Sequence, residues 1–455
     1  MTWHIFRLMV FLSLVQKNNF MDKKLRQALL KEYQAKFPLK KFIPGESFVP
    51  ASGKVFDEQE ILAATEAVLD GWWTEGRFSD LFEEKISKWL GVKHAILVNS
   101  GSSANLLALA ALKSARLGNK KLNDGDEVIT VAAGFPSTVN PIVQNNLKPV
   151  FVDVDLGTYS INVEAVKKAV GRKTKAIVVA HTLGNPFNLE AIGKICRKNN
   201  LWLIEDNCDA LGSKYKGKFT GTFGHISTGS FYPAHHITMG EGGAIFTDDP
   251  LLNKIIRSLR DWGRDCWCKT GYDNTCGKRF KRQLGSLPLG YDHKYIYSEM
   301  GYNLKLTDMQ AAIGVAQMEK LDSFVKKRKE NFNSLYQGLK KYEEFFILPS
   351  WHKGAEPSWF GFLLTVKSEA PFNRNQFVSY LQEKKIGTRY LFAGNIVKQP
   401  YFIDRKVKYR LAGNLANTDL IMNNSFWIGC YPGLTEPMLK YVVDSFDSFL
   451  SDFKK

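Results

Sequence analysis

The chain has 455 residues, of which 44% are hydrophobic and 24% are charged, as is ordinary for a soluble globular protein. Its formal net charge of +17 points first to nucleic acid, but the basic residues are scattered over expected surface helices rather than gathered in a dense run interleaved with aromatics. We therefore predict no nucleic-acid partner and a phosphate-bearing small substrate instead.

The number and grouping of the cysteines indicate the redox state of the compartment in which the protein works. Six cysteines are too few for a disulfide framework in a chain of this length. Four of them, Cys208, Cys266, Cys268 and Cys276, are grouped in one part of the sequence. This grouping favours a metal site in a reducing compartment, and we predict a cytoplasmic protein.

The first 20 residues contain one apolar run, LMVFLSLV, behind Arg7. The run is too short to span a bilayer, and the segment lacks the small-residue cleavage site of a signal peptide. We expect residues 1–20 to be a non-native or disordered extension, with the true start at Met21 and Met1 as the alternative. We predict no membrane attachment.

Residues 21–56 follow as an expected amphipathic helix and an extended arm that contains three prolines. Beyond the arm, apolar runs alternate with helical patterns, which is typical of a mostly parallel sheet covered on both faces. Strands are expected at 94–100, 126–133, 148–155, 176–181 and 201–206, and helices at about 138–145, 162–170 and 188–199.

The domain division follows from a change of pattern late in the chain. A long helix is expected from near Thr307, and a mixed α+β pattern follows after about residue 330. We predict a large α/β domain over 57–325, with a cysteine-cluster loop at 262–282, and a smaller C-terminal α+β domain over 326–455.

A cofactor pocket is expected where the strand 201–206 ends. Asp206 lies at the C-terminal end of that strand, and a second short strand, STGSFY, leads toward the Gly-rich turn GEGG. Ligands of α/β proteins bind at this edge of the sheet. The turn Gly101-Ser102-Ser103 between a strand and a helix is either a phosphate seat or an ordinary serine N-cap.

Five motifs occur in a specific order along the chain. They are SGSSAN, FPSTVNPI, IEDNCDALG, SFYPAHHITMGEGG and GYNLKLTDMQAAIG. In this order they resemble the nucleotide-sugar aminotransferases, over roughly residues 50 to 450. The resemblance implies the aspartate-aminotransferase-like fold of PLP-dependent transferases (fold type I), with a large, mostly parallel domain and a smaller C-terminal α+β domain.

The resemblance also implies a vitamin B6 cofactor, PLP or PMP, and assigns residues to it. By this resemblance Phe135 stacks on the pyridine ring, and Asp206 pairs with the ring nitrogen and keeps it protonated. Asn303 reaches the cofactor phosphate of a neighbouring subunit, which implies a homodimer, and Arg389 lies near the sugar nucleotide. The cofactor phosphate is held by Gly101, Ser102 and Ser230.

One position departs from the family pattern. The family has a lysine five residues before the first glycine of GEGG, where it links covalently to the cofactor, and here that position is His235. Imidazole cannot form this link, so ordinary transamination is disabled, but it can still remove a proton. We therefore predict a PMP-dependent dehydratase with His235 as its base. Asp209, where the aminotransferases tend to carry glutamine, is expected to assist catalysis.

The cysteines refine this prediction. Their pattern, C-x57-C-x-C-x7-C over Cys208, Cys266, Cys268 and Cys276, resembles the [2Fe–2S] site of the family's 3-dehydrases of 3,6-dideoxyhexose synthesis. Those enzymes deoxygenate CDP-4-keto-6-deoxy-D-glucose for O-antigen and related surface glycans. By this resemblance the substrate is a CDP-sugar, and the partner is an NAD(P)H-dependent flavin/iron–sulfur reductase that supplies two electrons.

Two alternatives remain open from the sequence. Four thiolates bind zinc as well as an iron–sulfur cluster, so a zinc-stapled, inactive binding or regulatory protein is one of them. The other is a cluster-free GDP-4-keto-6-deoxymannose 3-dehydratase, which shares the histidine substitution but is expected to lack the C-x-C-x7-C loop.

Overall fold

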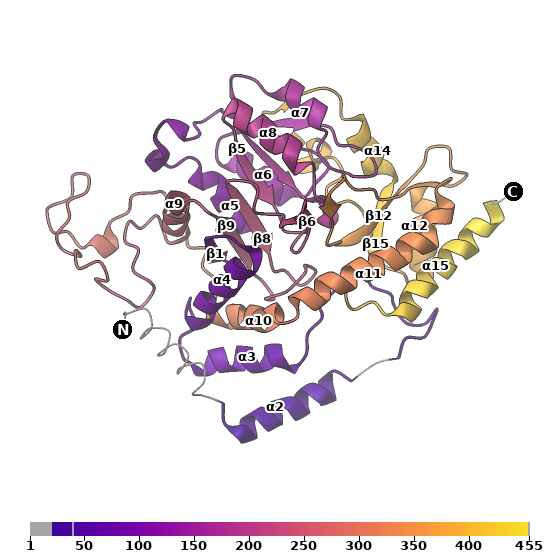
Figure 1. The fold of residues 1–455 in the computed structure, drawn as a ribbon, viewed down its shortest axis with the longest axis horizontal. Coiled ribbons are helices and arrows are strands. Elements are labelled where there is room, and N and C mark those ends of the chain that lie inside the picture. The colour runs from indigo at the N-terminus through magenta and orange to yellow at the C-terminus, as the bar shows by residue number, and fades with distance from the viewer. Residues whose placement is uncertain (1–20, 39–40, 454–455) are drawn as a thin grey trace.

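The protein was analysed as a computed structural model that describes residues 21–38 and 41–453 (Figure 1). The expected N-terminal extension, 1–20, lies outside the described residues. A large central sheet with helices packed around it forms one side of the molecule, and a smaller sheet forms the other (Figure 1). The predicted α/β, aspartate-aminotransferase-like fold class is confirmed.

Among the described residues, the large sheet has eight strands, in the order β1-β9-β8-β5-β4-β2-β3-β14. Its strands are β1 (His94–Val98), β2 (Glu127–Val131), β3 (Lys148–Val152), β4 (Thr174–Ala180), β5 (Trp202–Asp206), β8 (Ile226–Ser230), β9 (Gly243–Thr247) and β14 (Arg410–Leu411). Only β9 runs against the others, since it pairs antiparallel with both β1 and β8. The C-terminal ends of β4, β5 and β8 therefore meet at one edge.

Helices cover both faces of this sheet because its strands are apolar on both sides, as the fully buried β2 illustrates. They are α4 (Arg77–Leu90), α5 (Gly101–Ala111), α6 (Pro136–Gln144), α7 (Val163–Ala169), α8 (Leu189–Asn199), α9 (Pro250–Arg260) and α10 (Asp308–Met318). The N-terminal segment adds α2 (Lys23–Lys36) and α3 (Glu58–Leu69), of which α3 packs on α10.

The smaller sheet has the order β10-β12-β15-β13. Its strands are β10 (Phe346–Ile347), β12 (Gly361–Val366), β13 (Thr388–Arg389) and β15 (Ser425–Gly429), and the accompanying helices are α11 (Leu321–Leu339), α12 (Arg374–Glu383), α13 (Pro400–Asp404), α14 (Ala416–Asn424) and α15 (Glu436–Leu450). A third, short sheet consists of β6 (Lys214–Tyr215), β7 (Lys218–Phe219) and β11 (Ala355–Glu356).

The long helix expected from Thr307 is interrupted. It forms two helices, α10 and α11, which are separated by Glu319 and Lys320. Lys320 stays in the right-handed region but departs from ideal helix dihedrals, with φ −103° and ψ −10°. The Nζ of Lys320 donates to Glu60 at 2.6 Å, which ties the break to α3. The expected domain boundary at 325/326 falls inside α11, and β14 from the C-terminal part joins the large sheet, so the two parts share continuous elements.

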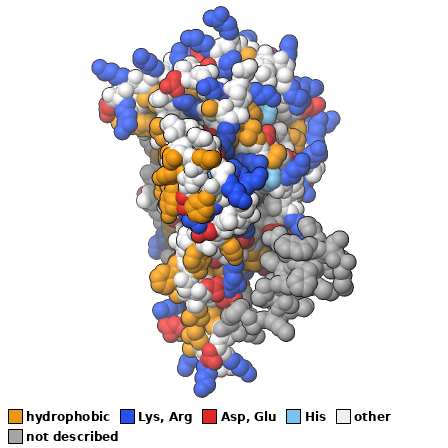
Figure 2. Space-filling model, turned by 90° about the vertical axis from the view of Figure 1, so that its left-hand side faces the viewer, with side chains coloured by type: hydrophobic (Ala, Val, Ile, Leu, Met, Phe, Trp, Pro, Cys, Tyr) orange, Lys and Arg blue, Asp and Glu red, His pale blue; other side chains and the backbone are white. Residues whose placement is uncertain are grey.

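The segment 262–300 extends from the large domain as a lobe without regular helices or strands, apart from one short 3₁₀ turn. Exposed aromatic and aliphatic side chains are concentrated on it, and Figure 2 looks at this side of the molecule. Among the described residues, no helix is long and apolar enough to cross a membrane.

Candidate active site

Asp206 is held in place at the C-terminal end of β5. Its side chain is buried, and its Oδ2 accepts hydrogen bonds from Asn105 Nδ2 at 2.9 Å and Thr138 Oγ1 at 2.7 Å. Its Oδ1 accepts from the backbone N–H of Cys208 at 3.2 Å. Three donors from three segments thus orient one carboxylate, as a residue that binds a protonated ring nitrogen requires.

A buried pair of hydrogen-bonded side chains lies directly behind this carboxylate. Glu205, the preceding residue of β5, accepts a hydrogen bond from His181 Nε2 at 3.0 Å, and both side chains are 0% exposed. Burial acts to raise the pKa of Glu205, but His181 and the backbone N–H groups of Gly221 and Gly224 outweigh it and lower that pKa. The pair anchors the turn 221–224 to the strand that carries Asp206.

The expected phosphate seat lies where α5 begins. The Ser100 side chain caps the helix by accepting from the N–H of Ser103, which leaves the earlier N–H groups of Gly101 and Ser102 for a ligand. Ser230, at the end of β8, contacts this turn so closely that a Cβ on Gly101 would lie 2.5 Å from the Ser230 Cβ. The structure thus brings Gly101, Ser102 and Ser230 together.

The remaining cofactor and substrate residues are more exposed. Phe135 precedes α6 with half of its side chain exposed and contacts Phe392 edge to face at 5.5 Å between centroids. Asn303 is exposed and accepts from Lys305 Nζ at 2.7 Å. Arg389, on β13, is exposed and donates to the carbonyl of Thr388. The roles of these three residues stay predictions.

His235 lies against the turn that follows Asp206. Its Nδ1 is 2.6 Å from the backbone carbonyl of Cys208. Because a carbonyl can only accept, Nδ1 carries the proton and Nε2 of the neutral ring keeps its lone pair. Burial lowers the pKa of His235 to about 4, so the ring is neutral at pH 7 and able to accept a proton.

Asp209 accompanies this base. One of its carboxylate oxygens lies 4.0 Å from His235 Nδ1. Burial, followed by the nearby negative charge of Asp206, raises the pKa of Asp209 to about 7. This carboxyl group can therefore hold or release a proton near neutral pH.

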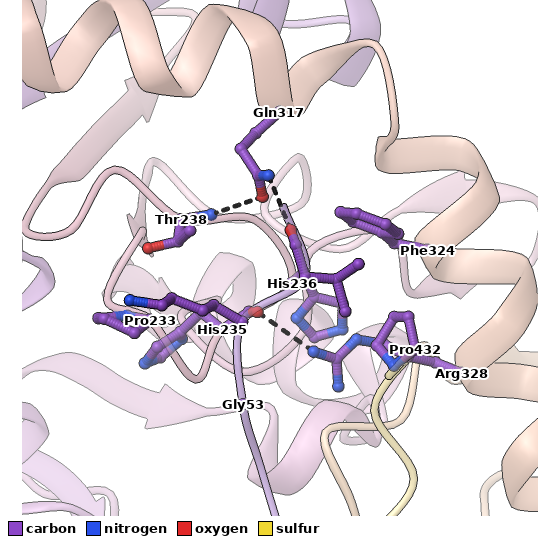
Figure 3. Close-up of a pocket in the computed structure, with 11 residues that line it drawn as sticks. Gly53, Pro233, His235, His236, Thr238, Gln317, Phe324, Arg328 and Pro432 are labelled. Atoms are coloured by element: carbon purple, nitrogen blue, oxygen red, sulfur yellow. Dashed lines mark hydrogen bonds between the residues drawn. The ribbon is translucent and has the colours of Figure 1, made fainter. Parts of the chain in front are cut away.

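The other side of His235 lines a recess (Figure 3). The buried guanidinium of Arg328 reaches the His235 carbonyl there, and His236 turns away to donate from Nε2 to the carbonyl of Ser358 at 2.8 Å. The recess leaves about 10 Å³ for the centre of a water molecule, which is about the room that one water needs.

The cysteines divide between two places. Cys266, Cys268 and Cys276 line a small pocket in the lobe together with His293, whereas Cys208 lies in the cofactor pocket beside Asp206 and Gly101. Within the described ranges, no group of three or more histidine, cysteine, aspartate or glutamate side chains is arranged to hold a metal ion. The four-cysteine ligand set stays a prediction.

The thiols of the two places also differ in acidity. Burial, with Asp206 next to it, raises the pKa of Cys208 well above its ordinary value. Burial also raises the pKa of Cys266. At Cys268 burial acts in the same direction, but hydrogen bonds with Thr275, Cys266 and Cys276 together outweigh it and lower the pKa. The lobe therefore offers the more accessible thiolate.

Several residues in or near the candidate site were not predicted from the sequence. Asn105 and Thr138 stand inside two of the ordered motifs, SGSSAN and FPSTVNPI, so those motifs offered a signal for them. His293 gave none, yet it is buried with Nε2 on Asp265 at 2.7 Å, and its Nδ1 has no hydrogen-bond partner in the described part of the chain. Arg328 is hidden in the basic run KKRK.

Residues 55–447 match the DegT/DnrJ/EryC1/StrS aminotransferase family. The chain belongs to this family. It is 60% identical over 410 residues, 90% of this chain and 93% of the relative, to the lipopolysaccharide biosynthesis protein RfbH of Salmonella typhimurium. It is 49% identical over 424 residues, 93% of this chain and 91% of the relative, to the dTDP-4-dehydro-2,6-dideoxy-D-glucose 3-dehydratase of Saccharopolyspora spinosa.

A solved structure has the same overall fold. The E. coli GDP-4-keto-6-deoxy-D-mannose 3-dehydratase with bound hydrated PLP superposes with a TM-score of 0.78 at 30% identity, over 88% of this chain and 99% of that one.

Proposed function

We propose that this protein is a PMP-dependent nucleotide-sugar 3-dehydratase that carries a [2Fe–2S] cluster and removes the 3-hydroxyl of CDP-4-keto-6-deoxy-D-glucose. The product is a CDP-4-keto-3,6-dideoxyhexose for lipopolysaccharide synthesis. One observation carries the proposal. His235 occupies the position of the family's lysine. Its Nδ1 is bonded to the carbonyl of Cys208, on the turn that follows Asp206, which leaves Nε2 as a base.

The relatives support the reaction class. The name of the 49% identical protein states a 3-dehydratase acting on a dTDP-4-keto sugar, and that of the 60% identical protein states lipopolysaccharide biosynthesis. Two further relatives, at 32% identity, are named GDP-4-keto-6-deoxy-D-mannose 3-dehydratases. All of these substrates are 4-keto sugars, whereas the nucleotide varies, so the CDP group rests on the cysteine pattern alone.

The pocket suits a pyridine phosphate. Asp206 presents an oriented, buried carboxylate for a ring nitrogen, and the first N–H groups of α5 face the end of β8 at a turn where any residue larger than glycine would collide with Ser230. Phe135 has an exposed ring for stacking. When bound, PMP supplies an amino group that bonds to a sugar carbonyl and a ring that accommodates negative charge.

The chain's own side chains then handle the protons. His235 takes a proton at Nε2, while its Nδ1–H remains on the Cys208 carbonyl and fixes the ring. Asp209 is close enough, at 4.0 Å, to stabilise the resulting imidazolium or to supply a proton to the departing hydroxyl. Asp206 keeps its two oxygens fixed by Asn105, Thr138 and Cys208 throughout.

The reaction needs a reductant. Replacing H–C–OH by CH₂ next to the ketone consumes two electrons and two protons and releases one water. We propose that the electrons come from an NAD(P)H-dependent flavin/iron–sulfur reductase through a [2Fe–2S] cluster held by Cys208, Cys266, Cys268 and Cys276. Since no three such ligands are grouped for a metal within the described residues, this proposal requires the loop 262–282 to close around the cluster.

Two further features belong to the proposal. Asn303 is exposed near the lobe, consistent with a role at the cofactor phosphate of a second subunit in a homodimer. The soluble substrate and reductase correspond to a cytoplasmic enzyme.

The test combines substrate and metal analysis. Anaerobically purified protein with PMP and a reductase is incubated separately with CDP-, dTDP- and GDP-4-keto-6-deoxyhexoses, and products are identified by mass. We expect loss of the 3-hydroxyl with the CDP sugar, and two iron and two acid-labile sulfide per chain. Preference for the GDP sugar without iron would favour the cluster-free dehydratase, and stoichiometric zinc without activity would favour the zinc-stapled protein.

A further inference from the structure

Arg328, on α11, is a buried cation without a carboxylate partner. Its side chain is 1% exposed, and among the described residues no acidic group lies within ion-pair distance of it. Its guanidinium instead donates to three backbone carbonyls. They are those of Trp359 at 3.2 Å and Phe360 at 3.5 Å, and that of His235 at 3.2 Å, which Figure 3 shows.

Burying this unpaired cation costs folding free energy. A buried charge loses its hydration, and neutral carbonyls repay less of that loss than a carboxylate would. Moreover, the Nε of Arg328 has no hydrogen-bond partner in the described part of the chain. Leucine or methionine would fill the same volume without either cost. The contribution of Arg328 must therefore lie in how its guanidinium holds the three carbonyls.

The carbonyls belong to the two segments that surround the base. The Phe360 ring lies 5.4 Å from the His235 ring, and the Phe360 backbone N–H is fixed on the carbonyl of Leu183 at 2.9 Å. His236 also bonds this segment, at the carbonyl of Ser358, the residue before Trp359. Arg328 thus joins the main chain of His235 to the wall against which its imidazole packs.

The opposite side of the imidazole is fixed separately. Nδ1 donates to the Cys208 carbonyl at 2.6 Å, so the ring is held between the turn after β5 and the 358–360 segment. If the His235 peptide shifted, the short Nδ1 contact would lengthen, since the ring and its peptide move together. We infer that Arg328 is a positioning residue, which clamps the His235 peptide to the 358–360 segment so that the imidazole keeps its hydrogen bond to Cys208.

This inference rests on the proposed function, in which His235 is the base, but it has a test that needs no substrate. In the apoenzyme, a long-range ¹H–¹⁵N spectrum of the imidazoles reports the Nδ1–H tautomer, and the signals of His235 are assigned by their absence in His235→Gln. We expect Arg328→Met to lose the single Nδ1–H tautomer of His235, and Lys329→Met to keep it. Lys329 is the control because it follows Arg328 on α11. Its Nζ lies 4.0 Å from Oε2 of Glu356.

Kinetics provide the second readout. We expect Arg328→Met to lower kcat about a hundredfold, as misplacement by about 1 Å does, with the Kd for PMP within about twofold of the wild type. Arg328→Lys should recover part of the rate, and added guanidinium ion should restore rate to Arg328→Ala by occupying the vacated space.

Two outcomes overturn the inference. One is an unchanged His235 tautomer together with an unchanged kcat in Arg328→Met. The other is a parallel fall of kcat, PMP affinity and thermal stability without rescue by guanidinium, which would show that Arg328 only supports the fold. If the wild type deoxygenates no sugar nucleotide, the proposed function fails, and the apoenzyme spectrum still decides the role of Arg328.

Discussion

Histidine at position 235 changes what the pocket can do with a proton and with a carbonyl group. A lysine there would bond covalently to the cofactor aldehyde, which imidazole cannot do. A lysine can both form the covalent link and transfer protons. The neutral Nε2 of His235 can only transfer protons. In the proposed function, this one residue therefore restricts the pocket to acid–base catalysis.

His235→Lys tests this directly. We expect the variant to bind PLP covalently, as an adduct that borohydride fixes and mass spectrometry detects. Dehydration should fall by about a hundredfold to ten-thousandfold, the usual contribution of a general base. His235→Gln is the control, with the same loss of activity but without the adduct. Wild-type dehydration in either variant would contradict the role of His235.

Gly101→Ala tests the phosphate seat. The added methyl group would lie 2.5 Å from the Ser230 Cβ and 3.1 Å from the Cys208 Sγ, so α5 and β8 must separate. We expect PMP affinity to fall at least about tenfold, equivalent to about 1.4 kcal/mol. Gly171→Ala meets no atom within 4 Å and should bind PMP normally. Equal titration curves for the two variants would argue against a phosphate at α5.

At the scale of elements, the four cysteines are divided between the lobe 262–300 and the turn after β5. The lobe brings three thiols to one pocket, with the buried His293 beside them. The turn carries the fourth thiol into the cofactor pocket, where burial and the neighbouring Asp206 raise its pKa. A cluster shared between the two would connect electron delivery to the site of dehydration.

Cys266→Ser and Cys208→Ser test this connection. Each should lose iron and acid-labile sulfide and the net deoxygenation, while PMP titration stays close to that of the wild type. Cys196→Ser, in the buried face of α8, should keep its metal. Full metal content in Cys208→Ser would show that the lobe binds the metal without Cys208 and would make His293 the candidate fourth ligand.

The clamp between 235–236 and 358–360 predicts a pH dependence of stability. Burial lowers the pKa of His236 well below its ordinary value, so above pH 6.5 the buried ring is neutral in both folded and unfolded chains. Below pH 6.5 the unfolded chain binds the proton and the folded chain does not. The free energy of unfolding therefore decreases as the pH is lowered. At pH 5 this costs up to about 2 kcal/mol.

His236→Gln removes this titration. Urea unfolding at pH 7 and pH 5 should show that the variant loses about 1–2 kcal/mol less than the wild type between the two pH values. The variant is expected to be less stable at pH 7, because its amide replaces the bond to the Ser358 carbonyl imperfectly. Identical losses in both proteins would show that His236 is protonated in the folded state.

At the scale of the whole molecule, the regular elements of the large domain were predictable from continuous apolar runs. The run HAILV at 94–98 and the run WLIED at 202–206 form strands close to the expected bounds. The two residues of β14 are too few to give a pattern, and the direction of β9 depends on its neighbours β1 and β8, so neither was foreseen.

The site was predictable only through its ordered motifs. Asp206 and His235 follow from position within those motifs, and the structure brings both to the turn after β5. Arg328 could not be found in this way, because the run KKRK at 326–329 has the pattern of a solvated helix face, yet Arg328 is buried. Burial of one charge within such a run depends on tertiary contacts with 358–360.

The measurement that tests the central claim most directly is the identity of the product when the PMP-loaded enzyme meets a 4-keto-6-deoxy sugar nucleotide and a reductant. The account predicts a 3-deoxy-4-keto sugar, lighter than the substrate by one oxygen atom, and no amino sugar even with excess glutamate. A 4-amino sugar that retains its 3-hydroxyl would contradict the account, because it would show that His235 still supports transamination.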